Sequence, residues 1–211
     1  MSNVIGIEGI DNSGKTSTID FLIKKIEKEG FCVSTAPKRV GLEERFPSSL
    51  EERKIWYRKG NPNEIIETNL SSALKRNKKV KSMEDDIVFE SRGYTTILSS
   101  MIAMAMHRYQ INYWDGKMIV DEINKKINYS PLESQTYCLS FGRDFDNAFD
   151  EIKKRDIKGE LNQGFKDYLK NFNYAFERFS KEQNNLLKLS AYSSIEQNAE
   201  IIMGALLKNE N

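Results

Sequence analysis

Residues 7–16 read Ile7-Glu8-Gly9-Ile10-Asp11-Asn12-Ser13-Gly14-Lys15-Thr16. From Gly9 onward this stretch fits the pattern GxxxxGK[ST], in which the glycines let the backbone wrap closely around a phosphate group. A short run rich in β-branched residues (3–8) precedes the loop, and apolar residues recur at helical spacing after it (16–29). The sequence therefore predicts a strand, a phosphate-binding loop and a helix whose N-terminus points at the phosphates.

The residues of this loop have distinct expected contacts with a bound nucleotide. Lys15 brings a mobile positive charge to the β and γ oxygens of ATP, and the hydroxyl of Thr16 is expected to bind Mg²⁺. The residues expected to contact ATP phosphates are Gly9, Asn12, Ser13, Gly14, Lys15, Thr16 and Ser17. Because kinases, GTPases and motor proteins all carry such a loop, the function has to be read from other residues.

Composition and charge restrict the partners. The chain has 211 residues, of which 39% are hydrophobic and 30% charged, and its 32 Lys and Arg nearly balance its 31 Asp and Glu. A net charge of +1 gives no overall field for nucleic acid or an anionic membrane, so any anion site is expected to be local. The longest apolar passage (101–106) is too short to span a bilayer, and the N-terminus lacks the features of a signal peptide. These features predict a cytoplasmic protein.

The two cysteines are expected to be buried free thiols. Cys32 and Cys138 each lie within an apolar run, and neither belongs to a CxxC pair. Free thiols of this kind are typical of a reducing cytosol.

The periodicity of the rest of the chain alternates between strands and helices. Strands are expected at 3–8, 31–36, 86–90, 135–140 and 186–189, and helices at 16–29, 50–59, 62–79, 95–109, 117–128, 147–154, 162–182 and 194–207. Such alternation predicts an α/β fold of three layers around a parallel sheet of about five strands, in one domain covering residues 1–211. The helix at 95–109 is apolar over most of its surface, which leaves a core position and a homodimer face as alternatives.

The loop also resembles that of a known family. With Glu8 and Asp11 in place, it is similar to the loop of the thymidylate kinase family, Glu-Gly-x-Asp-x-x-Gly-Lys followed by Thr or Ser. The loop is the specific match, and the rest of the chain corresponds in order and spacing. The resemblance implies a P-loop kinase fold, ATP and Mg²⁺ as cofactors, and transfer of the ATP γ-phosphate to dTMP or a related (deoxy)nucleotide.

The resemblance implies roles for residues after the strand at 86–90. In the family this strand ends in Asp-Arg followed by an aromatic, and this chain has Glu90-Ser91-Arg92-Gly93-Tyr94. Arg92 is thus expected to bind the acceptor phosphate, which a planar guanidinium can grip with two hydrogen bonds. Glu90 takes the place of the Asp and is expected to hold Mg²⁺ or to accept a proton, the alternative being an ordinary carboxylate paired with a lysine.

Further acceptor contacts follow from the same resemblance. Asp11 is expected to meet the acceptor sugar, or alternatively to brace its own loop. In the expected cap segment (about 38–62), Arg58 is the best positional match for a second phosphate-binding arginine, with Arg53 as the runner-up. Trp56 is expected either to stack on the acceptor base or to anchor the cap helix in the core.

Catalytic cations are expected in a basic segment that corresponds to the family's lid (about 153–162). Because the loop at 9–16 contains no arginine, Arg155 is expected to reach the transferring phosphate. Lys153 and Lys154 are expected to be solvated. Lys38 and Arg39 are weak candidates for the acceptor site, and the basic run 75–81 is expected only to end a helix.

His107 and a group of methionines have structural interpretations, and two other functions remain open. His107, the only histidine, is expected to be structural, and the methionines at 101, 104 and 106 are expected to fill the core. A strand ending in Glu-x-Arg also resembles deoxynucleoside kinases, although residues 36–39 offer no carboxylate to activate a hydroxyl. The alternatives are thus a deoxynucleoside or other small-molecule kinase, and a nucleotide-binding module without catalysis.

Overall fold

The centre of the molecule is a parallel sheet. The computed structural model describes residues 2–37, 40, 45–47, 49–132, 134–142, 144–154, 163–184 and 186–208. Within these residues the strands are β1 (Asn3–Gly9), β2 (Val33–Thr35), β3 (Ile87–Ser91), β4 (Gln135–Ser140) and β5 (Leu186–Ser190). They pair in the order β2-β3-β1-β4-β5, every pair parallel. The predicted parallel sheet of about five strands is confirmed.

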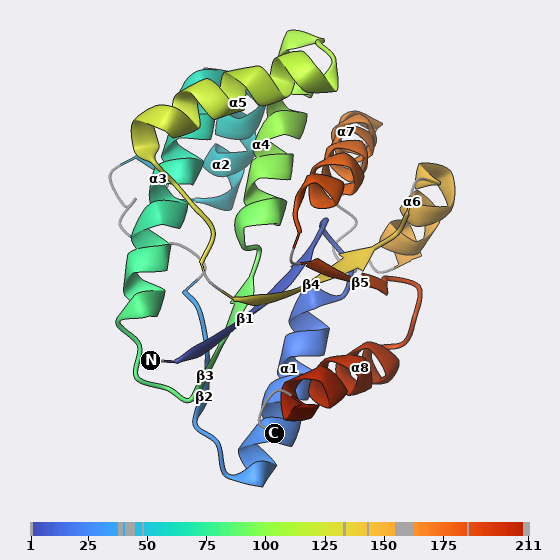
Figure 1. Ribbon diagram of the computed structural model, residues 1–211. Helices are drawn as coiled ribbons and strands as arrows, with labels where there is room; N and C mark the ends of the chain where they lie inside the picture. The colour runs from blue at the N-terminus through green and yellow to red at the C-terminus, as the bar shows by residue number, and fades with distance from the viewer. Residues whose placement is uncertain are drawn as a thin grey trace.

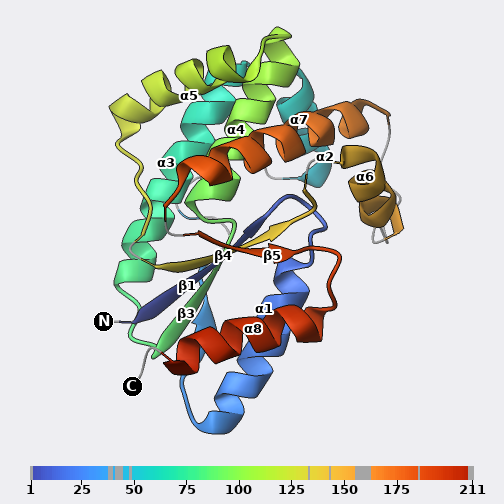
Figure 2. The same ribbon diagram turned by 45° about the vertical axis from the view of Figure 1, so that its right-hand side comes forward.

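The helices form a layer on each face of this sheet (Figure 1). The α-helices are α1 (Lys15–Ile26), α2 (Leu50–Lys59), α3 (Pro62–Lys81), α4 (Tyr94–Tyr109), α5 (Tyr113–Ile127), α6 (Phe145–Lys154), α7 (Gln163–Phe179) and α8 (Ile195–Lys208). Helices α1 and α8 pack together on one face, while α3, α4 and α7 cover the other and α5 packs outside α3 and α4. Figure 2 shows α6 beyond the sheet, next to one end of α7. The three-layer prediction is therefore confirmed.

Strand order places a functional edge beside β1. The chain leaves β1 toward β2 on one side of the sheet, whereas it leaves β4 toward β5 on the other. In open parallel sheets ligands bind outside the carboxyl ends of the strands at such a switch point. Here Gly9, the last residue of β1, lies opposite Leu139 of β4, so the loop at 9–16 begins at that point.

Helix α4 lies inside the molecule. Its buried residues include Leu98, Ile102 and all three methionines, and it packs against α3, α5 and α7. An apolar surface on all sides of a helix requires burial on all sides. Of the two positions left open by the sequence, α4 takes the core position, and the predicted core role of the methionines is confirmed.

Three predictions about the fold are wrong: the length of the second strand, the burial of Cys32 and the start of the helix predicted at 117–128. The second strand is only three residues long, and Cys32, just before it, is exposed because β2 is an edge strand; Cys138 is buried as predicted. Helix α5 begins at residue 113, since the side chain of Asn112 accepts hydrogen bonds from the next turn and caps it. Gly116, just outside the predicted helix at 117–128, lies within α5, where an added Cβ would be 3.2 Å from the carbonyl oxygen of Ile102. Helices α4 and α5 approach closely there.

Helices α1 and α7 end three residues before the predicted ends, and each continues as a 3-10 turn, η1 (Glu27–Glu29) and η2 (Ser180–Glu182). The other strand and helix boundaries fall within about two residues of the predicted ones. Among the residues that the structure describes, no helix combines the length and hydropathy needed to cross a bilayer.

Candidate functional site

The loop between β1 and α1 has the backbone of a phosphate cradle. Gly9, Asn12 and Gly14 have positive φ values of 151°, 59° and 95°. An added Cβ at Gly9 would be 2.8 Å from the carbonyl oxygen of Leu139, so no larger residue fits there. Asparagine tolerates the left-handed region, which explains how Asn12 takes part in the turn.

The N-terminus of α1 is open for an anion. Its N-cap, Gly14, supplies no side-chain cap, and its first turn contains no acidic residue. Thr16 and Ser17, which follow, are both exposed. The first amides of a helix point outward and carry its positive dipole end, so this terminus suits a phosphate group.

Lys15 is a buried cation inside the loop. Its Nζ donates a hydrogen bond to the carbonyl oxygen of Ile10 at 2.5 Å and lies 3.4 Å from Oγ of Ser13. Burial lowers the pKa of Lys15 to about 8, an effect that Arg92 strengthens and Asp11 opposes. The ammonium group is thus poorly solvated, which favours pairing with an incoming phosphate oxygen.

Glu8 connects this loop to α4. Its carboxylate is buried and accepts hydrogen bonds from the amides of Thr95 and Thr96, each at 3.0 Å, and from the Thr96 hydroxyl. The same hydroxyl oxygen accepts a 3.0 Å bond from the amide of Gly9. Since the N-cap of α4 is Gly93, which has no side chain, Glu8 caps the helix from a neighbouring strand.

Burial raises the pKa of Glu8, and the hydrogen bonds from Thr96 and Thr95 oppose that rise. The sequence indicated Glu8 only as part of a family pattern, and its capping contact was missed. The available signal was a glycine at the N-cap of a helix, with no Ser, Thr, Asp or Asn to satisfy the first amides.

Glu90 pairs with an arginine from α3. Nη2 of Arg76 lies 2.5 Å from Oε1 of Glu90, and both side chains are about 5% exposed or less. Nη1 of the same arginine donates to the carbonyl oxygen of Arg92 at 2.9 Å. Burial raises the pKa of Glu90 to about 7 and nearby Glu8 adds to the rise, whereas Arg76 opposes it.

The sequence-based interpretation of Arg76 as a helix-end cation is wrong. This residue lies in a helix that runs on to Lys81, and it faces the carboxyl end of β3 instead of solvent. The expected alternative partner for Glu90 was a lysine, and the structure supplies an arginine.

Arg92 and Asp11, predicted separately as acceptor contacts, meet in the structure. Nη2 of Arg92 lies 2.6 Å from Oδ1 of Asp11, although 81 residues separate them in the sequence. The two side chains remain 59% and 32% exposed, so the pair is open to a ligand. Arg92 directly follows β3 and has a φ of 68°, in the left-handed region.

The predicted cap residues Trp56 and Arg53 contact other residues of the cap segment. The Trp56 ring lies 5.0 Å from that of Phe46 and 5.1 Å from that of Tyr57, the packing of an anchoring aromatic. Nε of Arg53 donates to the carbonyl oxygen of Pro47 at 2.7 Å, and Arg58 is exposed on α2. None of these contacts joins the cap residues to the loop at 9–16.

Tyr168 of α7 was not predicted as a site residue. Its ring meets the edge of the His107 ring at a centroid distance of 6.4 Å, and burial raises its pKa above the usual value. Asp11 raises and Arg92 lowers that pKa, which places the phenol within electrostatic range of their pair. The sequence predicted only a helix over 162–182, and no local signal indicated this position.

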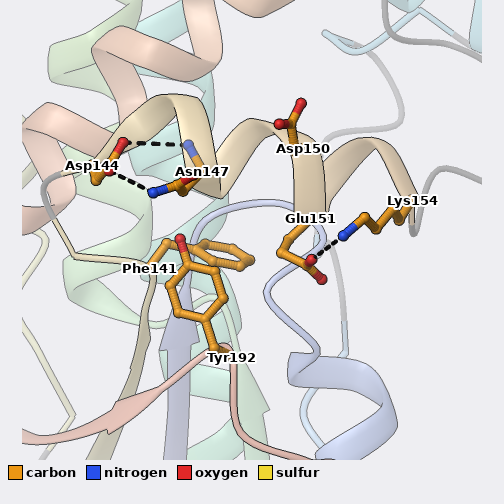
Figure 3. A pocket seen from close by; sticks show the side chains of 7 residues that line it. All are labelled: Phe141, Asp144, Asn147, Asp150, Glu151, Lys154 and Tyr192. Carbon is orange, nitrogen blue, oxygen red and sulfur yellow. Dashed lines mark hydrogen bonds and ion pairs between the residues drawn. The ribbon is translucent and has the colours of Figure 1, made fainter.

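A pocket of about 460 Å³ lies at the carboxyl ends of β4 and β5 (Figure 3). Its lining is Phe141, Asp144, Asn147, Asp150, Glu151, Lys154 and Tyr192. The rings of Phe141 and Tyr192 meet edge to face at 5.4 Å, and they follow the last residues of β4 and β5. Because Leu139 of β4 lies opposite Gly9, the pocket adjoins the loop at 9–16.

The basic residues predicted for the lid, together with Lys38 and Arg39, lie either outside the described residues or on the surface of α6. Arg155, most of the expected lid, Lys38 and Arg39 lie outside the described residues. Lys153 and Lys154 are exposed at the end of α6, and Lys154 pairs with Glu151 at 2.6 Å, so the solvated position expected for both is found.

Comparison with solved structures assigns the fold. Deoxyadenosine kinase from M. mycoides with bound dATP has a TM-score of 0.67 and 19% identity over 96% of this chain and 98% of that one. The same kinase with the products dCMP and a flexible dCDP has a TM-score of 0.66 and 19% identity, over 97% and 99%. Thymidylate kinase from Candida albicans has a TM-score of 0.66 and 13% identity, over 99% and 92%.

No family model matches the sequence, and none of the curated proteins matches it either. The structural likeness, at these identities, confirms a P-loop kinase fold, as the loop residues predicted.

The close approach of two carboxylates to Gly93 gives a stability prediction. A Cβ there would lie 2.6 Å from Oε1 of Glu8 and 2.8 Å from Oε2 of Glu90. Both carboxylates are buried and held by hydrogen bonds, so Gly93→Ala is expected to lower the free energy of unfolding by about 1–3 kcal/mol in urea denaturation.

Gly204→Ala is the matched control for this substitution. Nothing lies within 4 Å of a Cβ at Gly204, in the middle of α8, so alanine is expected to raise the free energy of unfolding by about 0.5–1 kcal/mol. Equal effects of the two substitutions would contradict the assigned role of Gly93.

The lowered pKa of Lys15 gives a pH prediction. Above pH 8 the free protein loses the Lys15 proton, whereas the phosphate complex needs it, so ATP affinity is expected to fall as pH rises through about 8. Lys15→Met is expected to weaken binding about 10- to 100-fold, from ~1.5–3 kcal/mol of charged hydrogen bonding, and to abolish that pH dependence. Titration calorimetry measures both, and a parallel pH dependence in the Met variant would exclude Lys15 as its source.

Proposed function

We propose that this chain, which has the P-loop kinase fold, transfers the γ-phosphate of ATP to a nucleoside monophosphate, with dTMP or a related deoxynucleotide as the acceptor. The observation that carries the proposal is the exposed pair of Arg92 and Asp11, 2.6 Å apart beside the loop at 9–16. The arginine matches an acceptor phosphate, and the aspartate matches a sugar hydroxyl. Both groups come from elements that end at the same edge of the sheet.

On the donor side, the phosphates of ATP are assigned to the loop at 9–16 and its base to the pocket of Figure 3. The amides at the start of α1 and the Lys15 ammonium bind the β and γ oxygens. The aromatic pair of Phe141 and Tyr192 offers an apolar wall for a purine, and the carboxylates of Asp144 and Glu151 are acceptors for ribose hydroxyls.

For Mg²⁺ the donors available in this chain are the exposed hydroxyl of Thr16 and one oxygen of Glu90. The Arg76 bond uses Oε1 of Glu90, which leaves Oε2 on the side of Gly93 and Glu8. The described residues contain no cluster of three metal-binding side chains, and magnesium bound together with a nucleotide typically takes few protein ligands. When bound, the ion neutralises charge on the transferring phosphate.

The protein groups then have separate roles in the proposed transfer. Arg92 orients the acceptor phosphate toward the γ-phosphate of ATP. Lys15 stabilises the negative charge on the oxygens of the transferring phosphoryl group. A further cation is needed near the transferring phosphoryl group, because the loop at 9–16 contains no arginine. From the sequence alone, we assign this role to Arg155. Arg58 is proposed as a second acceptor contact, since it is exposed on the cap helix.

A second candidate is a nucleoside kinase. It is favoured by the fold likeness to deoxyadenosine kinase, which covers nearly all of both chains. Such an enzyme needs a base for the sugar hydroxyl, and residues 36–39 after β2 contain no carboxylate. The monophosphate acceptor is therefore preferred.

The first test is an acceptor panel. The purified protein is incubated with Mg-ATP and separate nucleosides, nucleoside monophosphates and unrelated alcohols, and ADP release is measured. Turnover with deoxynucleoside monophosphates, dTMP among them, is expected. Turnover only with nucleosides would establish the second candidate. If none of the acceptors causes ADP release, both candidates are contradicted.

Arg92→Ala tests the acceptor contact in the same assay. Loss of a charged hydrogen-bonding partner is expected to raise the acceptor KM about 10- to 100-fold while the KM for ATP changes little. Arg178→Ala is the control, because that guanidinium stacks on Trp114, 4.7 Å from the ring centroid, on α5. Unchanged acceptor kinetics in Arg92→Ala would remove the main support for the proposal.

Tyr192→Ala tests the donor pocket. Removal of an aromatic contact worth about 0.5–1.5 kcal/mol is expected to raise the KM for ATP about 2- to 10-fold and to leave the acceptor KM unchanged. Tyr109→Ala, at the last residue of α4, is the matched control. A rise in the acceptor KM instead, with the KM for ATP unchanged, would indicate that this pocket binds the acceptor and not ATP.

A further inference from the structure

The acceptor arginine stands in an unfavourable backbone conformation. Arg92 has a φ of 68°, a region that non-glycine residues rarely adopt. Such conformations persist only where surrounding contacts fix them. Besides the side-chain pair with Asp11, Arg92 has a backbone contact with a buried residue: its carbonyl oxygen accepts a 2.9 Å hydrogen bond from Nη1 of Arg76.

Arg76 holds two parts of the site with one guanidinium. Nη2 lies 2.5 Å from Oε1 of Glu90, so the same planar group bonds both the last buried residue of β3 and the backbone two residues later. The rigid fork of a guanidinium sets the spacing of its two partners. Arg76 itself is only 4% exposed and comes from α3, which carries no part of the phosphate loop.

The Arg76 pair is poorly explained by stability alone. Within the described part of the chain, Nε of Arg76 is buried without a hydrogen-bond partner. A buried ion pair with an unsatisfied donor is no more stabilising than well-packed apolar side chains of similar volume. What an apolar pair could not supply is a donor aimed at the carbonyl oxygen of Arg92.

We propose that Arg76 is a positioning residue, which holds Arg92 in its left-handed conformation and thereby keeps its side chain against Asp11 for the acceptor phosphate. The proposal rests on the proposed function for its ligand, a nucleoside monophosphate. Its structural part, the dependence of Arg92 on Arg76, is independent of any substrate. Arg76 does not touch the substrate and acts through Arg92.

The test compares Arg76→Lys with Lys78→Met. Lysine keeps the charge opposite Glu90 but lacks the fork, whereas Lys78 is an exposed residue of the same helix. In Arg76→Lys the acceptor KM is expected to rise at least about tenfold, with the Kd for ATP within about twofold of the wild type. Lys78→Met is expected to change neither quantity. Weakening of ATP and acceptor to the same extent would indicate a general structural role and overturn the proposal.

A crystal structure of Arg76→Lys separates this inference from the proposed function. Arg92 is expected to leave the left-handed region and to lose its bond to Asp11, whichever acceptor the enzyme uses. Retention of the positive φ and of the 2.6 Å pair would overturn the inference even if the acceptor assignment holds. Conversely, movement of Arg92 in a protein inactive on monophosphates would contradict only the proposed function.

If Arg76→Lys does not fold, a double variant gives the same readout. Arg76→Met with Glu90→Gln removes both buried charges together, which avoids an unpaired carboxylate in the core. Its structure is expected to show Arg92 outside the left-handed region, and an unchanged Arg92 would overturn the inference.

Discussion

The buried carboxylate of Glu8 is the contact on which the site depends. Desolvation of a carboxylate is costly, and the amides of Thr95 and Thr96 offset that cost because they are unpaired donors at the start of α4. The Thr96 hydroxyl also bonds the amide of Gly9, where the phosphate loop begins. One charged group therefore fixes the end of β1, the first turn of α4 and the entry to the loop.

The position of Glu8 restricts the residues next to it. A side chain at position 93 is unfavourable, because the Glu8 and Glu90 carboxylates approach the place of its Cβ. The second carboxylate, Glu90, is balanced by Arg76, which in turn bonds the backbone of Arg92. A buried pair of opposite charges, Glu90 with Arg76, is thus joined through the Arg92 backbone to the exposed pair of Arg92 and Asp11. A chain with a net charge of only +1 can in this way present a local site for phosphate.

Much of the fold could be predicted because its signals are local. The ends of α2 and β4 coincide with those expected, since a glycine and a proline flank the first and turn-forming residues bound the second. The errors at Cys32 and at the start of α5 have different causes. The exposure of Cys32 depended on β2 being an edge strand, which only the tertiary structure decides, whereas the start of α5 was set by a local cap at Asn112 that the hydrophobic periodicity did not register.

The sequence by itself determined the phosphate loop, because its glycine positions, its lysine and the helix that follows are neighbours along the chain. It also supplied Arg92, Asp11 and Glu90 as candidates. Only the tertiary structure decided their partners: Glu8 with Thr96, Arg92 with Asp11 and Glu90 with Arg76 lie 88, 81 and 14 residues apart. Periodicity reports which face of an element is apolar, whereas the pairing of buried charges depends on which strand ends meet at one edge of the sheet.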